Sequence, residues 1–176
     1  MNFKGMIGLA AVVFAASMGC VKTGTVAEKQ PVASLAAYKS ASISVDAPSE
    51  MKNSEKYKSD FNNALAMRLK EKRIFMDVTP DGGDVAIKVK ITKMDTGSDV
   101  MRAVGPANSG ASEVSATVEL FDKESKAIGA FDVTGNSKKN VQTSVGGVNT
   151  AAMEDSTNKA IEAAAEEIAL YLEKKR

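Results

Sequence analysis

Apolar and polar residues alternate regularly in three stretches of the chain, residues 38–47, 85–92 and 114–120. A period of two predicts β-strands that bury one face and expose the other. In the stretch 85–92 two of the polar positions are lysines, Lys88 and Lys90, so this face is expected to point to solvent. A short apolar run at 74–78 and the segment 128–134 predict two further strands. We expect the last strand to return antiparallel to 114–120 across a polar turn.

A period of about four residues replaces the alternation in two other regions and predicts amphipathic helices. The first helix is expected to begin at Asn53 or Ser54, since either side chain can cap free amides, and to end near Arg73. The second is expected to begin near residue 149 or 150 and to reach the carboxyl terminus. The predicted buried positions are Tyr57, Phe61, Ala64, Leu65 and Leu69 in the first helix, and Met153, Ile161, Ala164, Ala165, Ile168 and Leu172 in the second.

These elements predict an α+β domain over residues 38–176, in the order β-α-β-β-β-β-α. We expect a mixed or antiparallel sheet of four to five strands, covered on one face by the two amphipathic helices. Residues 20–37 show no sustained period, which predicts a flexible tether before the domain.

The first nineteen residues have the features of an export signal. Lys4 supplies a positive start, residues 6–16 are uncharged and mostly apolar, and Gly19 precedes Cys20. The end of this segment resembles a bacterial lipobox, the sequence at which a diacylglycerol is attached to cysteine and the chain is cut before it. Ser17 departs from that pattern, which prefers Leu three residues before the cysteine.

We therefore expect Cys20 to carry acyl chains such as palmitate and to become the first residue of the mature protein. Several acyl chains hold a protein firmly at a membrane. An uncleaved anchor is the alternative, because residues 5–21 are uncharged and close to the length that spans a bilayer. Val21 is not Asp, so by the enterobacterial sorting habit the chain resembles lipoproteins of the outer membrane, on the periplasmic side.

The composition argues against most kinds of catalysis. The chain of 176 residues has no His and one Cys, which is Cys20. Ser-His-Asp and Cys-His nucleophile systems, and zinc sites built from Cys and His, are therefore excluded. Gly146 and Gly147 lack the spacing of a phosphate-binding loop, and no acidic stretch has the spacing of an EF-hand. We expect no enzyme, no cofactor and no metal, although an enzyme that uses carboxylates or a Ser-Lys pair stays open.

The charge balance argues against nucleic acid as a partner. The chain has 23 basic and 22 acidic residues, and removal of Lys4 with the signal makes the two equal. A protein that binds nucleic acid needs a basic surplus to neutralise phosphates. The basic residues near the end of the first helix are expected to complement its dipole instead.

The segment 97–112 breaks the strand pattern with three glycines, Pro106 and Arg102. Long connections in compact domains are either functional or disordered. Arg102 lies beside the apolar residues Met101 and Val104, a mixture typical of contact residues on loops. We therefore take Met101, Arg102 and Val104 as candidate partner-binding residues.

Several features resemble a family of bacterial lipoproteins known only as a domain of unknown function. These are Arg102, Gly105 and Gly110 in the long connection, the strand ending at residues 118–122, and the following strand to Gly135. The double glycine at 146–147 and the Ala-rich last helix complete the set. Ser125 and Lys126 stand where such relatives usually have Thr-Gly. The resemblance implies no known activity.

The expected function is that of a non-catalytic, lipid-anchored periplasmic lipoprotein that binds a protein partner or takes part in assembly of the cell envelope. This expectation depends on the anchor, on the tether and on the absence of His and free Cys. The alternative is a small-molecule or peptidoglycan-binding module that uses the exposed sheet face or the 97–112 segment.

Overall fold

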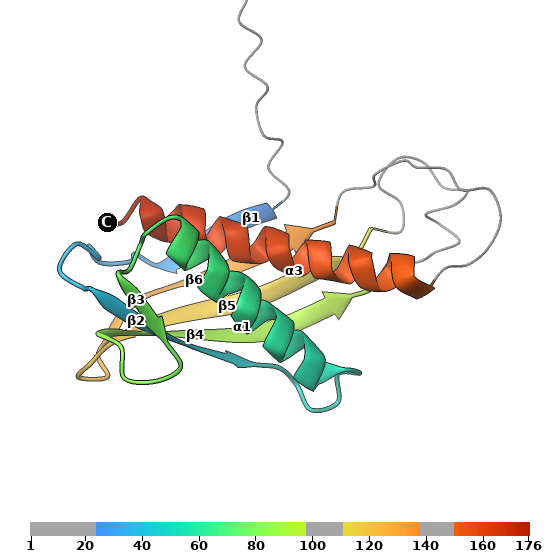
Figure 1. Ribbon diagram of the computed structural model, residues 1–176, viewed down its shortest axis with the longest axis horizontal. Helices are drawn as coiled ribbons and strands as arrows, with labels where there is room; N and C mark the ends of the chain where they lie inside the picture. The colour runs from blue at the N-terminus through green and yellow to red at the C-terminus, as the bar shows by residue number, and fades with distance from the viewer. Residues whose placement is uncertain (1–23, 98–110, 138–149) are drawn as a thin grey trace, which may run out of the picture.

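A six-stranded sheet with two helices on one of its faces makes up the protein in the computed structural model (Figure 1). The structure describes residues 24–97, 111–137 and 150–176. The strands are β1 (Gly24–Gln30), β2 (Ser40–Asp46), β3 (Asp77–Thr79), β4 (Val85–Asp95), β5 (Glu113–Asp122) and β6 (Ala127–Asn136), and the helices are α1 (Ser54–Glu71) and α3 (Thr150–Glu173).

The strands lie in the order β1-β6-β5-β4-β2-β3, and the sheet is open. β1, β6, β5 and β4 pair antiparallel, whereas β2 pairs parallel with β4 and with β3. A parallel pair needs a crossover, and α1 supplies it between β2 and β4. The mixed sheet, the α+β class and the two helices on one face are therefore confirmed.

The core lies between the sheet and the helices, and the alternating side chains of the strands build it. In β4 every second residue from Val85 to Ile91 is buried, while Lys88 and Lys90 between them are exposed. All the described positions of the two predicted helical stripes are buried, and Met153 lies outside the described side chains. The predicted faces of these elements are thus confirmed.

The prediction of a flexible tether over residues 20–37 is wrong from Gly24 onward. Residues 24–30 form β1, and Leu35 is completely buried. Backbone N–H groups of Ala33 and Leu35 donate to the carbonyls of Ile128 and Lys175, at 2.8 and 2.7 Å. β1 is an edge strand whose formation depends on pairing with the distant β6, so its own sequence carries little periodicity. It raises the strand count to six.

The predicted strand at 74–78 is largely wrong as well. Ile74 and Phe75 are buried, but only residues 77–79 form a strand. Arg73 has a φ of 52°, and the N–H of Ile74 donates to the carbonyl of Leu69 at 3.1 Å. The chain turns at Arg73, where α1 has ended. The side chains of Ile74 and Phe75 therefore pack into the core. Asn53 precedes α1 as expected, without a capping side-chain hydrogen bond.

Candidate functional site

The strand registers bring four chain segments to one end of the sheet. Glu113 at the start of β5 lies opposite both Asp95, at the end of β4, and Asn136, at the end of β6. Gly24, the first residue of β1, lies opposite Gly135. We call this the Gly24 end, defined by Gly24, Asp95, Glu113 and Asn136. Two of the three segments outside the described residues, 98–110 and 138–149, connect to the chain at this end, and the third, 1–23, precedes Gly24.

Three serines hold the segments of this end together. Ser137 Oγ lies 2.7 Å from Ser156 Oγ and accepts a hydrogen bond from the N–H of Ser112 at 2.9 Å. The hydroxyls of Ser112 and Ser156 are 3.0 Å apart, and Ser112 Oγ donates to the carbonyl of Thr96 at 2.8 Å. We call Ser112, Ser137 and Ser156 the serine cluster.

The serine cluster joins β4, β5, β6 and α3 inside the domain. Ser112 is 0% exposed and Ser137 is 4% exposed, so their polar groups depend on one another for hydrogen bonds. Both connecting segments therefore leave from a fixed base. Sequence reasoning missed the cluster, because its members come from three separate segments and share no motif.

The sequence-predicted site residues lie outside the described residues. Met101, Arg102 and Val104 belong to the segment 98–110, and Cys20 precedes β1. The structure places the two neighbours of that segment, Gly97 and Ala111, at the Gly24 end. The proposed roles of the four residues stay predictions.

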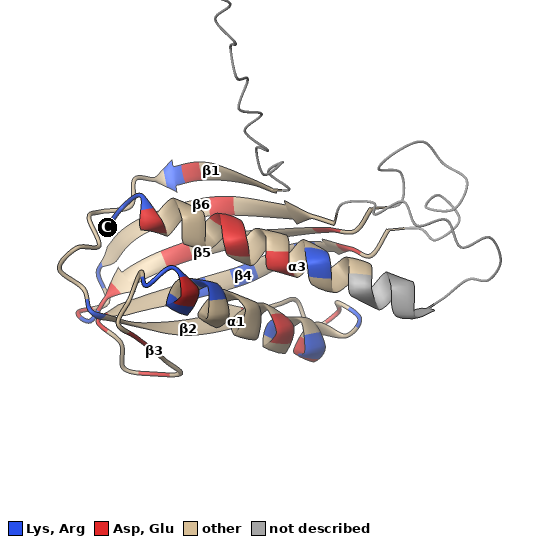
Figure 2. Cartoon of the chain, turned by 45° about the horizontal axis from the view of Figure 1, so that its top comes forward, with Lys and Arg blue, Asp and Glu red and all other residues tan. Residues whose placement is uncertain are grey.

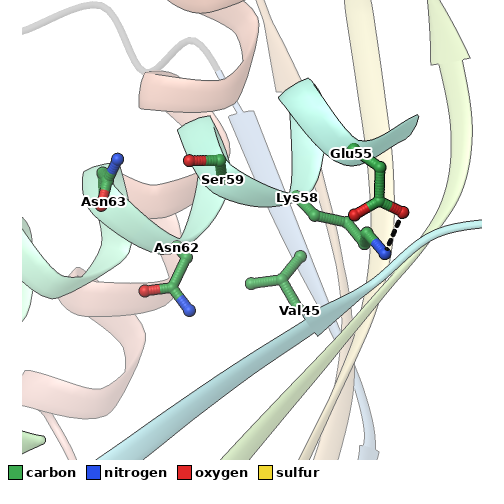
Figure 3. A pocket seen from close by; sticks show the side chains of 6 residues that line it. All are labelled: Val45, Glu55, Lys58, Ser59, Asn62 and Asn63. Carbon is green, nitrogen blue, oxygen red and sulfur yellow. Dashed lines mark ion pairs between the residues drawn. The ribbon is translucent and has the colours of Figure 1, made fainter. Parts of the chain in front are cut away.

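A shallow pocket of about 330 Å³ lies elsewhere, between α1 and the outer edge of β2 (Figure 3). β3 covers β2 only as far as Ser42, so the rest of this edge has no strand partner. Asn62 Nδ2 donates to the carbonyl of Ile43 at 3.3 Å and occupies part of the free edge. The pocket is lined by Val45, Glu55, Lys58, Ser59, Asn62 and Asn63.

The pocket offers polar groups but no buried charge. Lys58 pairs with Glu55 at 2.6 Å, and the Glu55 side chain is 85% exposed. An exposed pair of this kind contributes little binding energy. The polar lining comes from the face of α1 opposite its predicted apolar stripe, where the sequence shows only an ordinary solvent-facing pattern.

The sheet face opposite the helices is polar. On this face the Asp132 carboxylate has two partners. Lys29 Nζ lies 2.7 Å away, and Thr117 Oγ1 donates a hydrogen bond to it at 2.7 Å. Burial raises the pKa of Asp132, but these two partners outweigh it and hold the pKa below its usual value. On the same face Lys88 lies 4.7 Å from the ring centre of Phe121, a cation–π contact.

Two basic residues near the end of α1, Arg68 and Lys72, pair with acids. Figure 2 marks the basic and acidic positions of α1 and α3 in blue and red. Glu166 of α3 lies 3.2 Å from Arg68 Nε and 3.0 Å from Lys72 Nζ. A hydrogen bond to Glu166 raises the pKa of Lys72. Arg68 also pairs with Glu71 at 2.8 Å. The two pairs with Glu166 link α1 to α3.

Among the described residues, no group of three acidic, His or Cys side chains is placed to hold a metal ion. No helix in the same part of the chain is both long and apolar enough to cross a membrane.

A family model named domain of unknown function DUF4410 matches residues 25–140, so the chain belongs to this family. The predicted resemblance to a domain of unknown function is confirmed. The match begins at Thr25, within β1, in agreement with the structure and not with a domain that starts at residue 38. No curated protein sequence matches the chain.

Solved structures match the chain at low sequence identity. PelC from Paraburkholderia phytofirmans, described as a dodecamer, is 14% identical, with a TM-score of 0.50 over 82% of this chain and 96% of that chain. A minor lipoprotein from Acinetobacter baumannii is 15% identical, with a TM-score of 0.42 over 79% of this chain and 95% of that chain. At this identity the PelC match supports the fold alone.

Proposed function

We propose that this protein is a lipoprotein of the bacterial envelope, held by lipid on Cys20 at the periplasmic side of the outer membrane. The support is the signal-like segment 1–19, which ends in Gly19 directly before Cys20, the one cysteine of the chain. The folded domain begins only four positions later, at Gly24. The acylated residue therefore stands directly before an edge strand.

A Cys20→Ala variant tests the anchor. The native protein is expected in the membrane fraction, with a mature mass that starts at residue 20 and includes the acyl chains. The variant is expected to lose this mass change and to leave the membrane fraction once the signal is removed. Firm membrane attachment of a full-length variant would instead favour the uncleaved helix. Density separation of inner and outer membranes tests the location.

The anchored domain serves, in this proposal, as a non-catalytic component that binds a partner or takes part in envelope assembly. The observation that carries it is the Gly24 end, where the serine cluster fixes the base of two long connections. Rigid scaffolds that present contact residues on loops are a common arrangement for binding. The lack of His and of a second Cys supports a non-catalytic role.

Met101, Arg102 and Val104 are the proposed contact residues. PelC, which shares the fold, is described as a dodecamer, so a second copy of this chain is one partner to consider. Nucleic acid is not expected, given the balanced charge.

Crosslinking in intact cells tests partner binding. The native chain is expected to give a discrete adduct, and Arg102→Glu is expected to weaken it at least several-fold. Lys123→Glu is the matched control, because Lys123 is exposed in the turn at the opposite end of the sheet. Recovery of monomer alone from native cells, or equal loss in both variants, would count against the proposal.

The alternative function, binding of a small molecule or peptidoglycan, is supported by the polar pocket beside α1. Muropeptides that raise the unfolding temperature of the native domain, but not that of an Asn62→Leu variant, would favour it. The polar sheet face gives the same hypothesis a second surface, which Phe121→Ala would test.

A further inference from the structure

The sequence places the proposed lipid anchor, Cys20, four positions before Gly24, the first residue of β1. We infer that the Gly24 end faces the lipid bilayer and that the sheet stands with its strands steep to the membrane surface. This inference rests on the proposed acylation of Cys20. It concerns the orientation of the anchored domain on the headgroup surface and is separate from the protein partner proposed above.

The length of chain before β1 limits the distance between anchor and domain. Only residues 21–23 separate Cys20 from Gly24. A fully extended chain spans at most about 3.6 Å per residue, so Gly24 lies within roughly 15 Å of the acylated residue. A tether that ended at residue 37 would have allowed the domain to turn freely away from the membrane.

The strands are longer than this reach. β5 has ten residues and, at about 3.4 Å per residue, runs roughly 31 Å from Glu113 to Asp122. In the ladders, Asp95 and Asn136 lie at the near end with Glu113, whereas Val85 pairs with Asp122 at the far end. With Gly24 at the membrane, an upright sheet keeps the far end well beyond the headgroups.

The features of the β1 edge favour the upright orientation over one that lies on this edge. Glu28, Lys29 and Gln30 are exposed, so seating this edge in the membrane surface would take charged groups out of water. Glu28 pairs with Lys175 at 3.5 Å and Lys29 pairs with Asp132 at 2.7 Å. Burying these ion pairs under the bilayer surface would remove their hydration, which costs free energy. In the upright orientation the pairs stay in water.

The upright orientation also explains how the other surfaces stay available. The polar sheet face and the pocket beside α1 then look sideways, along the plane of the membrane. A neighbour held in the same membrane would meet these surfaces at matching height.

Site-directed labelling on vesicles tests the orientation. Acylation consumes Cys20, so an introduced cysteine is the one free thiol in the chain. We would label Asp95→Cys, at the near end of a distant strand, and Gln30→Cys, at the far end of the anchored strand. Both positions are exposed. The mature lipidated protein is reconstituted in vesicles of phosphatidylethanolamine and phosphatidylglycerol that contain a headgroup-quencher lipid.

The label at position 95 is expected to be quenched at least threefold more than the label at position 30. Equal quenching, or stronger quenching at position 30, means that the β1 edge lies on the bilayer and overturns the inference. Lys93→Cys, exposed on the same strand, provides a second near-end label in case Asp95→Cys folds poorly.

A longer tether is the matched control. Insertion of about fifteen Gly and Ser residues before Gly24 gives a flexible chain and is expected to remove the difference between the two labels. A difference that persists would overturn the role of the short connection. Failure of the proposed anchor is seen separately, since an unacylated Cys20 gives an unmodified mass, a second labelled thiol and no flotation with vesicles.

Discussion

Gly135 of β6 packs against Ala164 of α3 so closely that a Cβ at position 135 would lie 2.8 Å from the Ala164 Cβ. Backbone atoms of α3 lie nearer still. The missing side chain therefore lets α3 approach the sheet at the point where β6 meets β1.

Gly135→Ala is expected to destabilise the domain by about 1–3 kcal/mol, because backbone must move to admit the methyl group. Urea unfolding measures this loss. Gly82→Ala is the control, since a Cβ there meets nothing within 4 Å and costs only the positive φ of 79°. That cost is about 1 kcal/mol. Equal stability of Gly135→Ala and the native domain would refute the close packing.

Ser137→Ala is expected to cost about 1–3 kcal/mol, because it leaves the buried N–H of Ser112 without its acceptor. It also removes the contact with Ser156. Ser115→Ala should cost far less, since the Ser115 hydroxyl makes only a long, half-buried contact of 3.4 Å with Thr134. Thermal unfolding of the two variants side by side measures the difference, and similar losses would argue against the serine cluster.

Asp84 gives the domain a predictable response to acid. Its Oδ2 accepts hydrogen bonds from the backbone N–H groups of Lys39 and Ser40, at 3.0 and 3.2 Å. These bonds lower the pKa of Asp84. A lowered folded pKa means that the carboxylate stabilises the fold above its unfolded pKa of about 3.9. This contribution is lost as the pH falls through the lower folded pKa.

Asp84→Asn is therefore expected to be less stable than the native domain at pH 7, and the gap should close as the solution becomes more acidic. Denaturant unfolding across the range from pH 7 to pH 2 measures it. Asp81→Asn changes a neighbouring exposed carboxylate that makes no side-chain hydrogen bond among the described residues, and should leave the curve unchanged. A gap that widens in acid would contradict the assignment.

Amide hydrogen exchange distinguishes whether residues 25–35 form an edge strand or a flexible tether. Because β1 pairs only with β6, about half of its amides point toward a partner and should be protected. The N–H of Leu35, bonded to Lys175, should be protected as well. Exchange of residues 25–35 at the rate of an unstructured peptide would show that this segment does not join the sheet.

The elements that were predicted correctly have patterns set by their own burial. Val85, Ile87 and Val89 alternate with exposed residues because β4 lies in the middle of the sheet with one covered face. Phe61 and Leu65 recur with the helical period because α1 buries one stripe. In such elements the polarity of each residue matches its own burial, so one sequence is sufficient to predict the element and its buried face.

β1 could not be predicted from its own residues, because the strand it pairs with, β6, is remote in the sequence. Val26 is its one large apolar residue, and its partner Val133 is remote in sequence. The prediction of a strand at Ile74 and Phe75 was wrong for a different reason. Their apolar character correctly indicates burial, but the positive φ of Arg73 turns them into the core outside any strand.

For the candidate site, the sequence indicated which residue types could bind or carry lipid, but not which segments come together. Arg102 and its apolar neighbours stand out within a long connection, and Cys20 stands out as the single cysteine. The serine cluster could not be found in this way, because serine is common and its burial depends on strand register. That Gly24 shares an end with Asp95 likewise follows from pairing over long distances.

The place of β1 in the sheet has a consequence for the timing of export. β1 begins at Gly24, whereas its partner β6 begins at Ala127, so most of the chain must emerge before the two strands can meet. Until β6 has emerged, β1 has no partner strand and cannot join the sheet. On the proposed route, this leaves an interval in which the enzymes that process Cys20 meet a chain whose first strand is unpaired.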